Sequence, residues 1–204
     1  MEEWKNKRQK GIGGSDAAAI IGRSPYMTNQ ELWKIKTGRK QQEDISDKEF
    51  VKYGVKMEPV LIDMFRADNP QYEVFHEDYD VRYHKDYDFI LGSLDGYVLD
   101  KETGKYGVLE IKTCNINKYN KDKWYNQIPD NYFCQILHYM NCTNYDFAIV
   151  YALLKHTTYI EIKKYEFRRE EYQDQLDFLL NEEVKFWNNH ILADIEPNLL
   201  INLE

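Results

Sequence analysis

The sequence predicts an α/β fold in which helices flank a central mixed β-sheet. Apolar residues recur at helical spacing in the first part of the chain, and from about Tyr72 onward the period of the pattern falls toward two. A helical segment then separates three strands from two later ones, and a last helix follows. The order contains no internal repeat, low-complexity tract or domain linker, so it predicts one α/β domain.

Three helices are expected before the first strand. Ser15 opens the stretch SDAAAIIG (residues 15–22), where a residue suited to capping precedes an apolar run that a glycine closes. Residues 29–38 predict the second helix. The third begins at Ser46, where SDKE supplies a capping box with Glu49. Pro59 is expected to kink or restart this helix because proline lacks the N–H that would bond to the preceding turn.

The remainder of the chain alternates strands and helices. Three strands in hairpin succession, a helix, two strands and a long final helix are predicted. Their residue ranges are 72–84, 89–100 and 106–113 for the first strands, 129–142 for the helix, 146–154 and 157–167 for the later strands, and 168–192 for the final helix.

Composition points to a soluble globular protein of the reducing cytoplasm. Apolar residues make up 43% and aromatic residues 15% of the 204 residues, which is enough for one substantial core. No run of 18 apolar residues occurs, and the first ten residues are too polar for a signal peptide. The three cysteines form no CxxC pair, and their odd number is a poor basis for a disulfide framework. We therefore expect neither a membrane span nor export by a signal peptide.

The charge is unevenly distributed along the chain. The formal net charge is −8, which by itself argues against a nucleic-acid partner. Residues 166–204 carry three Lys and Arg against ten Asp and Glu, whereas residues 1–40 carry nine basic against four acidic residues. Most of the acidity thus belongs to the C-terminal segment, and the N-terminal region is free to face a polyanion.

The stretch GVLEIKT, from Gly107, places a carboxylate and an ammonium group on one face of a strand. Glu110 and Lys112 are two residues apart, so both project to the side that Val108 shares, about 7 Å from one another. Charges on a half-buried face are costly without partners. The preceding strand offers Asp95, in SLDGY, beside a glycine that permits close backbone approach.

Asp95 and Glu110 on neighbouring strands predict a site for a hard cation such as Mg²⁺ or Mn²⁺, to which the Ile111 carbonyl could add an oxygen. Lys112 would then position a water or stabilise charge on a phosphate. A Glu-x-Lys pair alone is usually a structural ion pair, and a lone Asp95 is most often a turn residue. The three residues together in an apolar strand context favour the functional interpretation.

These residues resemble the Asp…Glu-x-Lys core of the restriction-endonuclease-like nucleases, with Leu94 where phage members commonly have proline. The wider pattern is similar to the lambda-exonuclease or YqaJ-type viral recombinase nucleases. It runs from about Trp4 to about Tyr151 and includes WKNKRQKGIGGSD, YGVKMEP and YFCQILHYM in the expected order. The Lys-Thr-Cys continuation at 112–114 lacks the proline that relatives carry there.

The resemblance implies a role for further residues. Arg8 and Ser15 match residues that hold the 5′-terminal phosphate, and Glu58 matches a third acidic residue that helps hold the first metal ion or a second one. Tyr132 and Gln135 fall on motif positions of the following helix, and Gln135 would grip phosphate with Arg8 and Ser15. Each also has a plainer interpretation: Arg8 as a solvated charge, Ser15 as a helix cap, Glu58 as an exposed glutamate and Gln135 as a hydrogen-bonding partner of the backbone. No histidine shows a ligand spacing, and the seventeen tyrosines are expected in the core and interfaces more than in a base-stacking platform.

The resemblance also implies an activity and its setting. We expect a Mg²⁺- or Mn²⁺-dependent 5′-3′ exonuclease on 5′-phosphorylated duplex DNA ends, with two ions, in phage-type homologous recombination. Relatives form ring trimers, and a single-strand annealing or single-strand-binding protein would be the natural partner, in the cytoplasm of a bacterial host of a phage or prophage. The expected single nuclease domain, 1–204, has a core at about 46–166, an N-terminal end-binding segment at 1–40 and an acidic helix at 168–192.

Two alternatives remain open from the sequence. An endonuclease of the same fold would cut circular DNA. A non-catalytic DNA-binding or inhibitor protein on a nuclease scaffold would bind no Mg²⁺, although such a module has no need to retain Asp95, Glu110 and Lys112 together.

Overall fold

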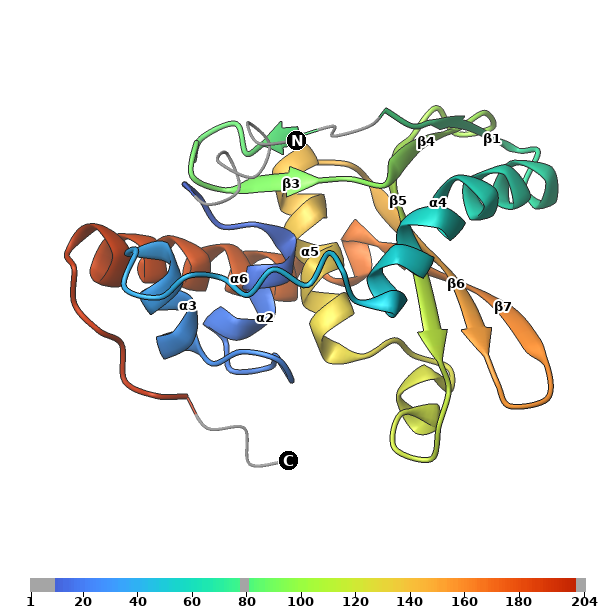
Figure 1. Cartoon of the computed structure of the whole chain (residues 1–204). Coiled ribbons are helices and arrows are strands. Elements are labelled where there is room, and N and C mark those ends of the chain that lie inside the picture. Colours follow the sequence, from blue (N-terminus) through green and yellow to red (C-terminus); the bar gives the residue numbers. More distant parts are fainter. Residues whose placement is uncertain (1–9, 78–80, 201–204) are drawn as a thin grey trace.

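A five-stranded mixed sheet with helices on both faces forms the centre of the computed structural model, which describes residues 10–77 and 81–200 (Figure 1). The strand order is β1-β4-β5-β6-β7, with β5 and β6 parallel and the other pairs antiparallel. The strands are β1 Tyr72–Phe75, β4 Gly96–Asp100, β5 Tyr106–Asn115, β6 Phe147–Lys155 and β7 Ile160–Arg168. The predicted fold class is confirmed.

The central strand β6 is apolar because helices cover both faces of the sheet. Its side chains are buried from Phe147 through Leu154, and alternate residues enter two different cores. Ala148 and Val150 face the core under α5 (Asp130–Thr143), whereas Ile149 and Tyr151 face the core under α4 (Glu49–Asp68). The sheet therefore separates two apolar layers.

The first two predicted strands each divide in two. Residues 72–84 form β1 and β2 (Val81–Tyr83), and residues 89–100 form β3 (Leu91–Ser93) and β4, with β2 and β3 paired in a separate two-stranded sheet. The break between β3 and β4 falls at residues 94–95 of the SLDG turn. Gly96, the first residue of β4, passes so close to β1 that a Cβ there would lie 2.8 Å from the Phe75 carbonyl oxygen. The expected simple succession of three strands was wrong in this respect.

The N-terminal helices begin differently from the predicted caps. The first helix is α2 (Gly14–Ile20), and its cap is Gly13, whose N–H donates to Asp16 Oδ2 at 2.9 Å, so Ser15 lies inside the helix and does not cap it. The next helix, α3 (Asn29–Lys36), has the capping box that sequence reasoning did not assign: Thr28 Oγ1 accepts from the N–H of Glu31 at 3.1 Å.

Helix α4 starts later than predicted and runs through its proline. Ser46 donates its N–H to Asp44 at 2.9 Å, and α4 begins at Glu49 without a side-chain cap, so the expected Ser46 box was wrong. Pro59 lies inside one 20-residue helix. Proline leaves the Val55 carbonyl without its helical donor, and Val55 is 66% exposed, so water can satisfy that oxygen.

The predicted final helix is shorter than expected. A 3₁₀ turn (Arg169–Glu171) precedes α6 (Gln173–Phe186), and a π-helical segment (Trp187–Leu192) follows it. The Arg169 side chain donates to the carbonyls of Tyr145 and Met140 near the end of α5. These bonds hold the 3₁₀ turn against α5, separate from α6.

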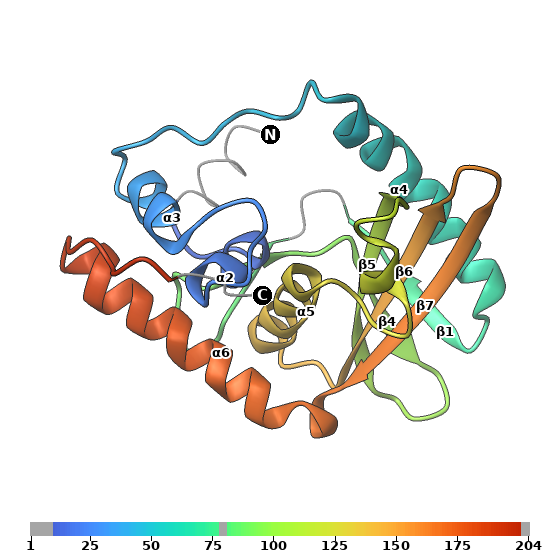
Figure 2. The same ribbon diagram turned by 90° about the horizontal axis from the view of Figure 1, so that it is seen from below.

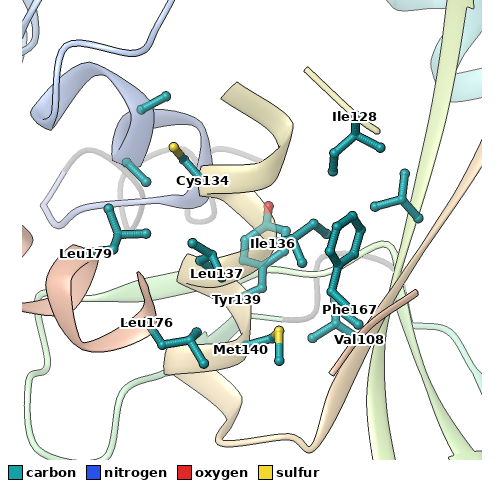
Figure 3. Close-up of a cluster of buried hydrophobic side chains, with 14 of the residues drawn as sticks. Val108, Ile128, Cys134, Ile136, Leu137, Tyr139, Met140, Phe167, Leu176 and Leu179 are labelled. Carbon is teal, nitrogen blue, oxygen red and sulfur yellow. The ribbon is translucent and has the colours of Figure 1, made fainter. Parts of the chain in front are cut away.

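Helices α2, α5 and α6 gather on one side of the sheet and α4 lies on the other (Figure 2). Figure 3 shows the larger core, in which α5 residues such as Ile136 and Met140 pack between Val108 of β5 and Leu176 of α6. The three cysteines are unpaired. In residues 10–77 and 81–200, no helix is long and apolar enough to cross a membrane.

Candidate active site: a buried carboxylate pair beside a lysine

Strand β5 carries the centre of the site. Val108 belongs to the core under α5, whereas Leu109 and Ile111 belong to the core under α4. Because side chains alternate along a strand, Glu110 and Lys112 lie on the α5 side, as predicted. The Lys112 ammonium donates to Glu110 Oε1, with the two side chains 15% and 2% exposed. The pair is thus held within the fold and not on its surface.

Asp95 meets this strand from the turn between β3 and β4. Ladder pairing of β4 with β5 ends at Gly96 opposite Leu109, so Asp95 extends just beyond the last pair. Its Oδ2 accepts the N–H of Ile111 at 2.8 Å. The Glu110 carboxyl lies close enough to act on the pKa of Asp95 through a side-chain hydrogen bond. The two acids therefore converge, which is the arrangement on which the sequence prediction depended.

The electrostatics follow from crowding two acids in a dry place. Burial and then the neighbouring Asp95 raise the pKa of Glu110 to about 8, with a smaller contribution from Glu58, although Lys112 opposes the shift. Burial also raises the pKa of Asp95, against Lys112 and the Ile111 N–H. Burial lowers the pKa of Lys112, but the Glu110 and Asp95 carboxylates raise it by more, so this lysine remains an ammonium group.

One oxygen of the pair lacks a partner. Glu110 Oε2 is buried and accepts no hydrogen bond from the described part of the chain. A buried polar atom of this kind is costly unless something compensates it. Two converging carboxylates with an orphaned oxygen fit a hard divalent cation, because such cations prefer oxygen ligands.

The third acid does not join the pair. Within residues 10–77 and 81–200, no three His, Cys, Asp or Glu side chains are arranged to hold a metal ion. Glu58 is half-buried on α4, one turn after Gly54, where a Cβ would lie 3.6 Å from Thr113 of β5. It is close enough to contribute to the raised pKa of Glu110. The metal roles of Glu58 and the Ile111 carbonyl stay predictions.

Helix α5 adds an aromatic ring and an amide to the site. The Lys112 ammonium lies 4.8 Å from the centre of the Tyr132 ring, whose pKa burial raises to about 12. Gln135, one turn later, donates to the Tyr139 hydroxyl at 2.9 Å. A Cβ on Gly14, the first residue of α2, would lie 3.0 Å from Gln135, and the exposed Ser15 follows Gly14 directly. Arg8 lies outside the described residues.

Sequence reasoning missed His76. Its Nδ1 lies 2.5 Å from the Asp95 carbonyl oxygen, and the ring is among the groups that lower the pKa of Asp95. A carbonyl oxygen only accepts, so Nδ1 carries the proton. The contact arises because Phe75 pairs with Tyr97 across β1 and β4, which places the next residue beside the SLDG turn. No spacing in the sequence signals this register.

The chain matches a known protein family and a related bacterial protein in sequence. The family model for the YqaJ-like viral recombinase domain matches residues 3–146. The chain is 30% identical over 200 residues to the protein YqaJ of Bacillus subtilis (strain 168); the match covers 97% of the chain and 59% of that relative's length.

Solved structures share the fold at low identity. An alkaline exonuclease (LHK-Exo) from Laribacter hongkongensis has a TM-score of 0.59 at 16% identity, over 95% of this chain and 98% of that one. A phage-related exonuclease from Haemophilus somnus 129PT has a TM-score of 0.57 at 15% identity, over 91% and 96%. The resemblance of Asp95, Glu110 and Lys112 to a nuclease core thus agrees with the family match over residues 3–146, and the chain belongs to the YqaJ-like viral recombinase domain family.

Proposed function

We propose that this chain is a divalent-metal-dependent deoxyribonuclease that removes nucleotides from the 5′ ends of duplex DNA. The observation that carries the proposal is the Asp95 and Glu110 pair, with its orphaned Glu110 Oε2, beside the Lys112 ammonium. The proposal is supported by the exonucleases that share the fold, one of which, LHK-Exo, has been solved in complex with dAMP, a mononucleotide.

Asp95 and Glu110 would hold the first Mg²⁺ or Mn²⁺, with the Ile111 carbonyl as a further ligand and Glu58 helping there or at a second ion. A bound divalent cation lowers the pKa of a coordinated water and neutralises charge on the phosphodiester. Binding also relieves the repulsion between the two acids that raises the pKa of Glu110. The free site therefore stores unfavourable electrostatics that a cation offsets.

Lys112 orients the attacking water or stabilises the negative charge that develops on the phosphate. The Tyr132 ring beneath its ammonium group and the Glu110 oxygen beside it fix the position of that charge. Ser15 and Gln135, on helices that meet at Gly14, would bind backbone phosphate together with Arg8. A guanidinium group suits a terminal phosphate because it donates two parallel hydrogen bonds.

The remaining expectations belong to the same proposal. Residues 1–204 would act as one nuclease domain, with DNA ends bound by the N-terminal segment and the acidic α6 lying away from the DNA. A ring-shaped trimer would give processivity by enclosing the duplex, and a single-strand annealing or single-strand-binding protein would receive the product. The match to only 59% of the Bacillus subtilis relative leaves the activity of the longer protein outside this proposal.

The test compares Asp95→Asn, Glu110→Gln and Lys112→Ala with wild type on a 5′-phosphorylated linear duplex, with Mg²⁺ or EDTA. Each variant should release acid-soluble nucleotide at least about 10²-fold more slowly, the usual cost of removing one electrostatic group from such a site. Glu73→Gln, an exposed change on β1 of the same chemical kind, is the control and should match wild type. Full digestion by any site variant would remove the assignment.

Two further substrates decide the mode of cleavage. A 5′-hydroxyl duplex should be digested more slowly than the phosphorylated one, and closed circular DNA should resist. Digestion of the circle would identify an endonuclease of the same fold. Absence of calorimetric Mg²⁺ and Mn²⁺ binding by wild-type protein would instead favour a non-catalytic DNA-binding role.

A further inference from the structure

Two segments that carry exposed tyrosines lie at the end of the sheet where β5 and β6 finish. The loop of residues 116–128 and the tip of the β6–β7 hairpin lie together there, at the bottom of Figure 1. Tyr119 is 79% exposed, Tyr125 71% and Tyr159 56%. We call this surface, made by the loop and the hairpin tip, the tyrosine-lysine surface.

A fixed backbone presents these rings. Trp124, in the middle of the loop, is 2% exposed, and its carbonyl accepts from the Tyr165 hydroxyl at 2.6 Å and from Lys163 at 3.1 Å. The N–H of Ile116 donates to the Lys155 carbonyl at 2.8 Å and ties the loop to β6. Tyr125 follows the buried Trp124 directly, so its ring is turned outward by an anchored chain.

The surface is basic on an acidic protein. Residues 116–128 contain three lysines and one aspartate, and residues 155–163 contain two lysines and one glutamate, in a chain with net charge −8. The ammonium of Lys118 lies 4.9 Å from the centre of the Tyr119 ring, and that of Lys163 lies 5.9 Å from the Tyr125 ring. Rings and positive charges therefore alternate, which is the composition that binds unpaired nucleic acid.

The surface adjoins the proposed active site. Strand β5 leads from Glu110 to Asn115, about 16 Å at the usual rise for a strand. Rings also connect the two places: Lys112 lies on Tyr132, whose ring centre is 5.7 Å from Trp124, the anchor of the loop. A strand leaving the site would reach the tyrosines within a few nucleotides.

We propose that the tyrosine-lysine surface binds single-stranded DNA, namely the strand left unpaired as its complement is removed. Tyrosine rings stack on any base whose face is free, and the lysines contact the backbone, so recognition is independent of sequence. Duplex bases stack on one another and offer no such face. The origin of the strand rests on the proposed nuclease function, but the binding itself requires no hydrolysis. The sequence led us to expect the tyrosines in the core and interfaces more than in base stacking, whereas these three are exposed.

The experiment measures binding of fluorescently labelled oligo(dT) by anisotropy in EDTA, where no metal is available for hydrolysis. The variant Tyr119→Ser/Tyr125→Ser/Tyr159→Ser should bind at least about 5-fold more weakly, the lower end for the loss of one base-ring stack. The control is Tyr83→Ser, a 45% exposed tyrosine on β2, which should bind as wild type does. Thermal denaturation checks that each variant is folded.

A second variant tests the charges independently. In Lys118→Gln/Lys121→Gln/Lys123→Gln, the slope of log K against log salt concentration should become shallower by about 2, at roughly 0.7 for each phosphate contact on a single strand. Unchanged affinity of the tyrosine variant, or a loss confined to duplex DNA, would overturn the proposal. Wild type that binds oligo(dT) but digests no duplex would sink the nuclease function and leave the surface standing. Digestion of duplex DNA by wild type, together with unchanged oligo(dT) binding by the tyrosine variant, would leave the nuclease function standing and overturn the proposal for the surface.

Discussion

Replacing Glu110 with glutamine should stabilise the metal-free protein while it abolishes nuclease activity. Glutamine has nearly the shape of a protonated glutamic acid and cannot ionise. The Glu110 side chain is 2% exposed and adjoins Asp95, and both circumstances penalise its charged form. The variant removes that penalty and keeps the packing.

The magnitude follows from the raised pKa. The folded protein holds a proton on Glu110 up to about pH 8, whereas the unfolded chain releases it near the ordinary value of 4.5. The stabilising effect of this proton is complete below pH 4.5 and is lost as the pH rises toward 8. Linkage gives a loss of about 3 kcal/mol by pH 7 and on the order of 5 kcal/mol above pH 9. At pH 8 the glutamine variant should be more stable by about 4 kcal/mol, or on the order of 10 °C in Tm.

Thermal and urea unfolding in EDTA between pH 5 and pH 9 would measure this difference. The gap between Glu110→Gln and wild type should be small at pH 5 and should widen up to about pH 8. The exposed Glu73→Gln change should show no such widening. A variant that is no more stable than wild type at pH 8, or a gap independent of pH, would refute the reasoning that the site stores repulsion between buried acids.

Two further predictions concern the fold around the site. The His138 ring and the Glu183 carboxyl form a fully buried pair at 2.7 Å. Burial by itself would lower the pKa of His138, but Cys142 and Glu183 favour the charged imidazole more strongly and raise this pKa well above its usual value. Glu183→Ala should therefore lower the free energy of unfolding in urea by about 3–5 kcal/mol. The stabilisation that the wild-type pair provides should be complete below about pH 6.5 and should decline as the pH rises through the raised pKa of His138. An equal cost of the substitution at pH 6 and pH 10 would contradict this. Gly107→Ala places a Cβ 2.2 Å from the Phe147 ring, so the free energy of unfolding should fall by about 1–3 kcal/mol. The double variant with Phe147→Leu should recover part of that loss. Strictly additive effects of the two substitutions would show that the sites are independent and would contradict the clash.

Local patterns in the sequence were sufficient for much of the fold. Alternation along residues 106–113 correctly placed Glu110 and Lys112 on one face, because the side-chain period of a strand is a local property. Caps were predicted less well. Ser46 and Ser15 have suitable side chains, but local contacts occupy these positions differently: Gly13 caps the first helix with Asp16, and Ser46 donates its N–H to Asp44 before α4 begins.

The sequence by itself determined the α/β class, the face of the strand that carries the charged pair and the acid opposite it, since these depend on periodicity and on a glycine turn. Only the tertiary structure decided that His76 contacts Asp95, that Glu58 lies near the pair without joining it, and that the two segments carrying three exposed tyrosines lie together at one end of the sheet. Each of those facts depends on strand register or on packing between segments distant in the chain, and no local pattern of residues encodes such a distance.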